Sequence, residues 1–420
     1  MENNKTPTIR FKGFTDPWEQ RKLSELATMH ARIGWQNLRT SEFLDVGDYM
    51  LITGTDFEDG KVNYSTCHYV EKERYDQDKN IQIKNGNILI TKDGTLGKVA
   101  YVEGLSLPAT LNAGVFNVEV KDGNETDSKY LFQFLKAPFL MDYVSKKATG
   151  GTIKHLNQNI LVDFPIAIPS RAEQAKIGEY FTNLDNLITL HQRKYNKLLN
   201  VKKSMLEKMF PKNGSNIPEI RFKGFTDPWE QRKLGELVDR VVRKNTNNES
   251  TLPLTISAQY GLVDQITYFN NRVASRDVSN YYLVLNGEFA YNKSTSDGYP
   301  FGAVKRLDLY EKGVLSTLYI VFAPKREQQI DSDYLTVFFD TDRWHKGVAE
   351  RAAEGARNHG LLNISAEDFF DIDLSVPKDI VEQEQIGGFF KQLDNLITLH
   401  QRELEKLQNI KKSMLEKMFV

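Results

Sequence analysis

Several stretches of this sequence combine cationic, amide and hydroxyl side chains with glycine, as nucleic-acid contacts require. Arginine pairs with guanine, and asparagine or glutamine with adenine, whereas phosphate oxygens accept from lysine and hydroxyl groups. In the first half of the chain, the candidate contacts to double-stranded DNA are Arg32, Trp35, Gln36, Asn37, Arg39, Lys92, Thr95, Lys98, Lys146, Lys147, Thr152, Lys154 and His155. In the second half, they are Lys293, Ser294, Thr295, Ser296, Tyr299, Arg351, Arg357, Asn358 and His359. For each stretch, an ordinary solvated loop is the alternative.

The usual patterns of catalytic residues do not occur in the sequence. The string from Gly94 to Lys98 resembles a phosphate-binding loop, but it lacks the required glycine spacing and a Ser or Thr after the lysine. There is no dinucleotide-binding glycine motif and no serine nucleophile elbow. The seven histidines and the single cysteine supply no metal-ligand spacing. We therefore predict a binding protein with no catalytic residue, no metal and no cofactor of its own.

Composition limits the remaining classes. With 420 residues, the chain is long enough for two or three domains. A formal net charge of -1 argues against a protein that coats nucleic acid through its overall charge alone. It does not exclude local basic loops. Cys67 is the only cysteine, so no internal disulfide can form and a reducing compartment is expected. Without a signal segment or a membrane-length apolar run, we expect a cytoplasmic protein that does not enter a membrane.

The element that must position these loops is a long amphipathic helix that occurs twice, at residues 171–210 and 380–420. The strings LDNLITLHQR and KKSMLEKMF are unchanged between the copies. Apolar residues recur at three- and four-residue spacing along each copy, which predicts a coiled-coil seam. At about 1.5 Å per residue, the aligned part of each copy, residues 174–210 and 383–419, extends over about 55 Å. We predict that the two copies pack antiparallel and hold two domains apart.

The same helix carries the expected partner-binding positions. They are Leu184, Leu187, Ile188 and His191 in the first copy, and Leu393, Leu396, Ile397 and His400 in the second. Polar residues within the seam, His191 and Lys202 with their counterparts His400 and Lys411, are expected to set register, or else to lie half-exposed at its rim.

A second repeat sets the domain organisation. The string IRFKGFTDPWEQRKL starts at Ile9 and returns unchanged at Ile220. The chain is thus predicted to consist of a first domain at residues 1–170, a helix at 171–210, a linker at 211–219, a second domain at 220–379 and a helix at 380–420. This is a tandem duplication of one domain with its helix.

Between the repeated segments, the two variable regions share little sequence but are predicted to share an α+β fold built on a twisted sheet. Residues 86–102 indicate a hairpin around Asp93 and Gly94, and residues 287–307 a second hairpin. Asp127 and Asp331 each begin a predicted helix start, where the aspartate or the serine that follows it can cap the free backbone N–H groups. The repeated segments are nearly identical, whereas the regions between them differ. This pattern favours an adaptor whose two variable regions recognise different targets and whose repeated segments bind two copies of one partner. A recent duplication without functional division is the alternative.

These motifs resemble those of the DNA specificity subunit of type I restriction-modification enzymes. The resemblance covers the whole length and includes PWEQRKLGEL at Pro228, AIPSRAEQAKIGEYF at Ala167, and the repeated helix strings. It implies two tandem target recognition domains, separated by two long conserved helices that form an antiparallel coiled coil. It also implies a non-catalytic subunit that reads a bipartite, asymmetric DNA site, one half per domain.

The resemblance further implies partners and their cofactors. These are two methyltransferase subunits that use S-adenosylmethionine to modify adenine, and ATP-dependent restriction subunits that use Mg²⁺. Two other readings of the residues remain: a protein-binding scaffold without DNA, and an enzyme with a site assembled across the halves. Steeply salt-dependent binding to duplex DNA would favour the DNA reading over the scaffold.

Overall fold

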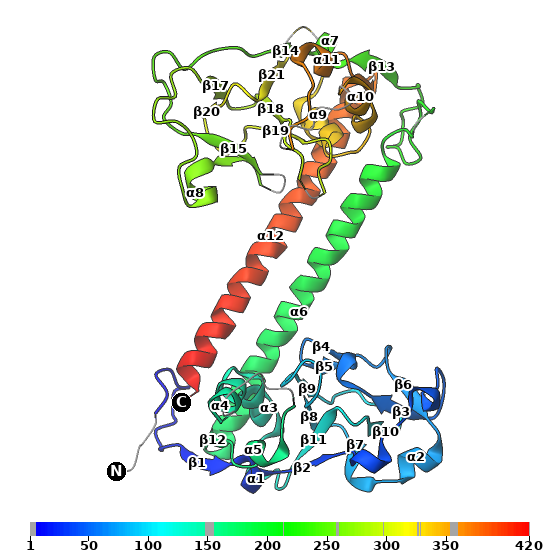
Figure 1. Cartoon of the computed structure of the whole chain (residues 1–420), viewed down its shortest axis with the longest axis vertical. Helices are drawn as coiled ribbons and strands as arrows, with labels where there is room; N and C mark the ends of the chain where they lie inside the picture. The colour runs from blue at the N-terminus through cyan, green and yellow to red at the C-terminus, as the bar shows by residue number, and fades with distance from the viewer. Residues whose placement is uncertain are drawn as a thin grey trace. The chain divides into compact units, whose positions relative to one another are not determined.

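The computed structural model describes residues 6–147, 155–212, 214–257, 260–296, 298–325, 327, 329–352 and 360–419, with the side chain of Trp35 excepted. The chain forms two compact units: residues 1–193 with 401–420, and residues 194–400. Each unit holds one variable region with parts of both long helices, α6 (Arg171–Lys208) and α12 (Ile380–Met418) (Figure 1). The division at residues 170, 210, 219 and 379 stays a prediction.

The first unit is built on two larger sheets and one two-stranded sheet, β1-β12. Its main sheet has the strand order β2-β11-β8-β9-β5-β4, and its second sheet the order β6-β3-β10-β7. The strands are β1 (Glu19–Lys22), β2 (Ala27–Ala31), β3 (Tyr49–Ile52), β4 (Phe57–Glu58), β5 (Lys61–Val62), β6 (His68–Val70), β7 (Gln82–Ile83), β8 (Ile88–Thr91), β9 (Val99–Tyr101), β10 (Ala109–Leu111), β11 (Val115–Val120) and β12 (Pro165–Ile168). The helices are α1 (Leu23–Leu26), α2 (Lys72–Asp76), α3 (Ser128–Lys136), α4 (Phe139–Lys147) and α5 (Gln158–Leu161), with 3-10 turns at Gly34–Gln36, Thr40–Glu42, Gly54–Asp56 and Lys79–Ile81.

The second unit repeats the frame of the first. Its sheet β14-β21-β18-β19 corresponds to β2-β11-β8-β9, and the pair β17-β20 corresponds to β7-β10. The strands are β13 (Glu230–Lys233), β14 (Val238–Arg240), β15 (Leu254–Ser257), β16 (Gly261–Asp264), β17 (Tyr282–Leu285), β18 (Phe289–Asn292), β19 (Ala303–Arg306), β20 (Lys312–Leu315), β21 (Ile320–Pro324) and β22 (Asp373–Val376). The helices are α7 (Leu234–Leu237), α8 (Gln265–Phe269), α9 (Ser332–Phe339), α10 (His345–Arg351) and α11 (Ala366–Phe370). The α+β class is therefore confirmed.

Local signals placed the main hairpins and caps correctly. β8 pairs antiparallel with β9, and β18 with β19, as the two hairpin patterns predict. The side chain of Asp127 accepts from Tyr130 N at 2.9 Å, and that of Asp331 accepts from Tyr334 N at 2.7 Å. These bonds satisfy backbone donors that the first turn of a helix leaves free.

The repeated N-terminal string fastens each long helix to its unit. Arg10 donates two hydrogen bonds to the Glu173 carboxylate, at 2.7 and 2.8 Å, and Arg221 does the same to Glu382 at 2.6 and 2.8 Å. Both carboxylates are buried, so these bidentate pairs are shielded from water. α6 begins at Arg171 and α12 at Ile380, a few residues after β12 and β22 end.

Within each unit, the segments of α6 and α12 run antiparallel, as predicted. In the first unit, Phe181 stacks on Phe419 with ring centroids 5.5 Å apart, and Asp185, further along α6, bonds the earlier Lys411. In the second unit, Lys202 bonds Asp394, and the later Phe210 lies beside the earlier Phe390. The last aromatic residue of each copy thus completes an aromatic core, and both Phe419 and Phe210 are buried.

Candidate nucleic-acid interface

In the first unit, two loops predicted to contact DNA lie side by side. The β8–β9 loop is held against the segment before α5 because Leu156 N donates to Lys92 O at 2.9 Å. His155 Nδ1 lies 2.6 Å from Asp93 Oδ1, so the side chains of the two loops also pair. Both of these side chains are exposed. Two segments far apart in the sequence therefore form one surface.

The β8–β9 loop has a fixed internal geometry. The buried Thr91 hydroxyl bonds Thr95 O and accepts from Lys98 N at 2.9 Å, which pins both ends of the loop. Gly97 has a φ of 69°, and a Cβ there would collide with the Met141 sulfur. The positive φ thus favours glycine at this position. The loop presents Thr95 and Lys98 to solvent, while Lys92 is half-buried with Nζ 5.6 Å from the Phe116 ring centroid.

The second unit joins the equivalent loops in the same way. Lys293 follows β18 as Lys92 follows β8, and Leu362 N donates to Lys293 O at 3.0 Å. Thr295 N and its hydroxyl both donate to Gly360 O, at 2.7 and 3.0 Å. Ser296 pairs with Tyr299 across a short bridge, and Ser294 with Leu361. The structure therefore brings Lys293, Ser294, Thr295, Ser296 and Tyr299 together at the position that the β8–β9 loop has in the first unit.

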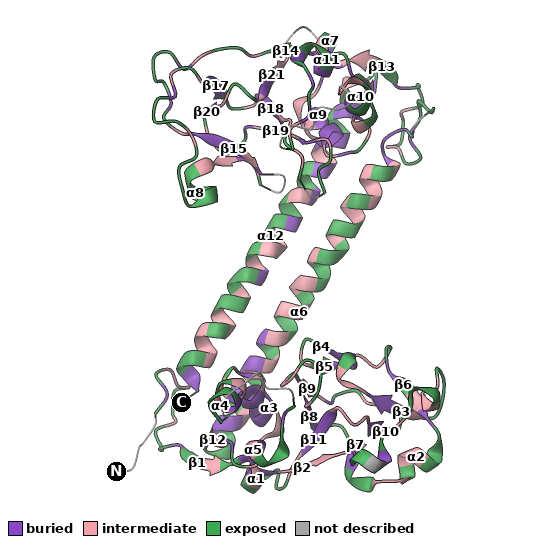
Figure 2. Ribbon diagram, in the orientation of Figure 1, coloured by how far each residue is buried: buried purple, intermediate pink, exposed green. Residues whose placement is uncertain are grey.

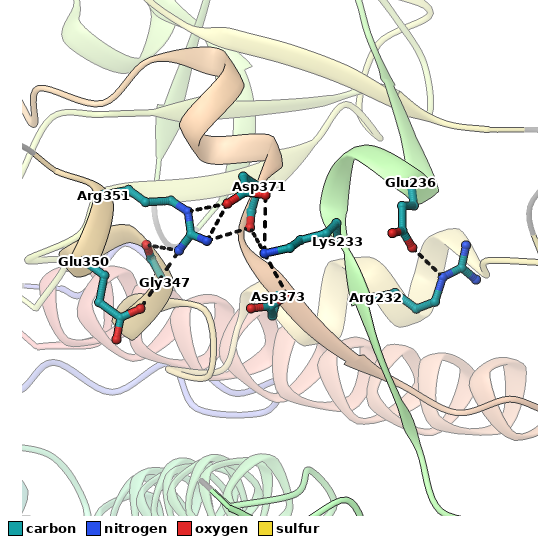
Figure 3. A network of polar contacts seen from close by, with 8 residues as sticks. All are labelled: Arg232, Lys233, Glu236, Gly347, Glu350, Arg351, Asp371 and Asp373. Atoms are coloured by element: carbon teal, nitrogen blue, oxygen red, sulfur yellow. Dashed lines mark hydrogen bonds and ion pairs between the residues drawn. The ribbon is translucent and has the colours of Figure 1, made fainter.

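Arg351 ends α10 in an ion-pair network rather than as a free cation (Figure 3). Its guanidinium lies 2.7 Å from Asp371 Oδ2 and also donates to Asp371 O and Gly347 O. Lys233 joins the network, 3.3 Å from Asp371 and 3.1 Å from Asp373. Hydrogen bonds from Arg351, then from Lys233, hold the pKa of Asp371 below its ordinary value. Arg351 thus fastens α10 to the turn between α11 and β22, and its assignment to DNA stays a prediction.

The stretch around Arg32 needs correction. Arg32 is only 2% exposed, and its guanidinium donates to Leu111 O at 2.8 Å and to Thr110 Oγ1 at 3.2 Å. Burial, followed by the charge of Arg74, lowers the pKa of Arg32. Gln36 is buried as well, and its backbone O accepts from Arg32 Nη1 at 3.4 Å, so neither side chain is exposed to a ligand in this structure. Of the candidate DNA contacts in this stretch, Asn37 and Arg39 are exposed.

Other candidates are exposed or lie outside the described residues. Lys146 and Lys147 are exposed in the last turn of α4, where cations also favour the helix dipole. Lys147 Nζ lies 5.7 Å from the Tyr143 ring centroid. The predicted contacts outside the described residues are Thr152, Lys154, Arg357, Asn358 and His359, together with the side chain of Trp35.

The repeated helices present a second candidate surface, because several of their apolar residues are exposed. Exposed positions recur along both α6 and α12 (Figure 2). Leu187 and Leu396, predicted as partner contacts, are each 46% exposed. Leu184, Leu393 and Ile397 are buried and belong to the cores, so their assignment to a partner surface is wrong, and Ile188, His191 and His400 are half-buried. Sequence reasoning missed Leu190 and Leu399, exposed at 46% and 52%, although they lie one helical turn away in the same repeated string.

Among the described residues, no group of three or more metal-ligating side chains gathers at one place. No described helix is long and apolar enough to cross a membrane. The candidate binding surfaces of the described residues are the paired polar loops on each unit and the repeated exposed leucines on the helices.

Comparison with known proteins agrees with this architecture. The family model for the type I restriction modification DNA specificity domain matches residues 15–200 and 226–409. The chain is 25% identical over 356 residues to the type I restriction enzyme MjaVIII specificity subunit of Methanocaldococcus jannaschii, covering 80% of this chain and 79% of that protein. It is 30% identical over 159 residues to the MjaIX specificity subunit of the same organism, covering 36% and 34%.

A solved structure has the same fold. The S subunit of a type I restriction-modification system from M. genitalium aligns over 99% of both chains with a TM-score of 0.65 and 15% sequence identity. Because the family model matches most of the sequence in two copies, the chain belongs to the type I restriction-modification DNA specificity family. It is a non-catalytic DNA-recognition subunit, and its two units each carry one target recognition domain.

Proposed function

We propose that this chain reads a bipartite, asymmetric DNA site, with one half-site contacted by each recognition domain. The observation that carries the proposal is that two equivalent frames hold different loops at the same position. Leu156 and Leu362 fasten these loops to Lys92 and Lys293 by the same backbone bond, while the exposed side chains differ. A common frame with different base-reading groups suits two half-sites of different sequence.

The chain also holds two methyltransferase subunits in this proposal. Each copy of the repeated helix exposes the same two leucines, so two copies of one partner would find identical surfaces. Exposed apolar side chains that gather on one helix face suit a protein partner better than solvent. S-adenosylmethionine would be bound by the methyltransferase subunits, and ATP with Mg²⁺ by the restriction subunits.

The test is to exchange one recognition domain. Residues 24–170 would be replaced by the matching region of another specificity subunit, and methylated adenines would be mapped in cells that also carry the partner subunits. We expect one half of the methylated site to change while the other half and the unread spacer stay the same. A change in both halves, or in neither, would contradict the proposal.

A further inference from the structure

The long helices offer the same pair of charges to each recognition domain. Asp185 and Asp394 occupy the same place in the repeated helix string, as do Lys202 and Lys411. Lys411 Nζ lies 2.5 Å from Asp185 Oδ1 in the first unit, and Lys202 Nζ lies 2.7 Å from Asp394 Oδ1 in the second. Each unit thus contains one Asp–Lys pair between α6 and α12. We call this Asp–Lys pair between α6 and α12 the charge seat of its unit.

In the first unit, a lysine of the recognition domain contacts the aspartate of the charge seat. Lys136 is the last residue of α3, and its Nζ lies 3.2 Å from Asp185 Oδ2. Gln133, one turn earlier, donates to the same oxygen at 3.0 Å. The side chain of Lys136 is 24% exposed, and those of Asp185 and Lys411 are 14% exposed, so water screens these charges only partly.

The second recognition domain places an anion at the equivalent position. Lys136 comes nine residues after its cap Asp127, and Asp340 comes nine residues after Asp331. Asp340 Oδ2 lies 3.1 Å from Lys202, the basic member of the seat. Its other oxygen lies 2.7 Å from Lys305 of β19, a lysine of the same recognition domain.

The two arrangements have different charge balance. In the first unit, Asp185 is shared by Lys136 and Lys411, which are close enough to repel each other. In the second, Lys202 is shared by Asp340 and Asp394, and Lys305 supplies a second positive charge. Burial lowers the pKa of Lys202, but its two aspartates outweigh burial and raise it overall. Burial also lowers the pKa of Lys136. Asp185 raises this pKa, but by too little to cancel the effect of burial. In the second unit, Asp340 thus contacts the helix lysine Lys202 and also Lys305 of its own domain.

We propose that this Asp–Lys pair is a docking surface for recognition domains, and that it accepts either charge at the C-terminal end of α3 or its counterpart α9. A basic residue binds the seat's aspartate, and an acidic residue binds its lysine. The identical helices can therefore hold recognition domains of unrelated sequence, as long as each carries a charge at this position. This inference concerns how the domains are held and does not depend on which DNA sequence each one reads.

The test converts the second unit to the arrangement of the first. In Asp340→Lys, three lysines would surround Asp394, and the melting temperature of the full chain should fall by about 5–10 °C. Adding Lys305→Ala reproduces the charge set of the first unit, in which Ala100 occupies the place of Lys305. At least half of the loss should then be recovered. If the double variant melts no higher than Asp340→Lys alone, the seat does not accept a cation there and the proposal is overturned.

A second measurement uses the first unit and does not depend on the Asp340 variants. In Lys136→Asp, the new carboxylate should bind Lys411, so removing that lysine should become more harmful. We expect Lys411→Met to lower the melting temperature by at least 4 °C more in the Lys136→Asp background than in the parent chain. Lys136→Met serves as the control that lacks charge. An equal or smaller effect of Lys411→Met in the Lys136→Asp background would overturn the proposal.

Discussion

Two adjacent glycines in α12 should respond to the same substitution in opposite directions. Gly387 lies where α12 packs against the start of α9. A Cβ on Gly387 would be 2.7 Å from Asp333 Cβ, 2.8 Å from Tyr334 N and 2.9 Å from Asp331 Oδ1. A Cβ on Gly388 would meet nothing within 4 Å. The sequence shows only a Gly-Gly pair, whereas the structure assigns close packing to one member.

The atoms around Gly387 cannot easily move. Tyr334 N donates to Asp331 Oδ1 in the cap of α9, and Asp331 N donates to the buried Gln383 Oε1 at 2.9 Å. Overpacking costs about 1–3 kcal/mol, and a disturbed cap costs about 1 kcal/mol more. Alanine regains about 1 kcal/mol in a helix interior. Gly387→Ala should thus destabilise by about 2 kcal/mol, whereas Gly388→Ala should stabilise by about 1 kcal/mol.

The assay is thermal unfolding of the full chain followed by circular dichroism. Gly387→Ala should lower the melting temperature by about 4–8 °C, and Gly388→Ala should raise it by about 2–4 °C. Gly178→Ala tests the same packing in the first unit, where a Cβ would be 2.8 Å from Tyr130 N. If both Gly387→Ala and Gly388→Ala raise the melting temperature, the reasoning about close approach is refuted.

Three further predictions concern DNA, partner assembly and pH. Lys98→Ala should weaken binding of the assembled complex to all DNA sequences alike and reduce the salt slope by about one, as for loss of a phosphate contact; a changed base preference would contradict this. Leu187→Asp should impair assembly with the methyltransferase subunit at an unchanged melting temperature, while Leu184→Asp, in the core, should lower that temperature; equal melting losses would refute the distinction. Burial raises the pKa of Asp185, but Lys136 and Lys411 outweigh it and hold the pKa below its ordinary value. This carboxylate therefore stabilises the fold above the unfolded pKa of about 3.9 and loses that effect as pH falls through the lower folded pKa. Asp185→Asn should flatten the acid-side decline in melting temperature, and an unchanged decline would contradict the assignment.

Repetition and local pattern were sufficient to predict much of the architecture. The unchanged helix strings predicted two long helices, and their apolar spacing predicted a coiled-coil seam. In the first unit, the contacts of Phe181 with Phe419 and of Asp185 with Lys411 show the antiparallel direction that the family resemblance implied. Hairpin and cap signals depend on a few neighbouring residues, so β8–β9 and the caps at Asp127 and Asp331 could be located without tertiary information.

Only the tertiary structure decided which polar and apolar residues are available to a ligand. Arg32 and Arg351 have the residue type that reads DNA, yet one is buried against backbone carbonyls and the other is paired with Asp371. Leu184 and Leu187 are three positions apart in one repeated string, but one packs in a core and the other is exposed. Residue type and spacing determine what a side chain can bind, whereas its neighbours across the fold determine whether that capacity is already used.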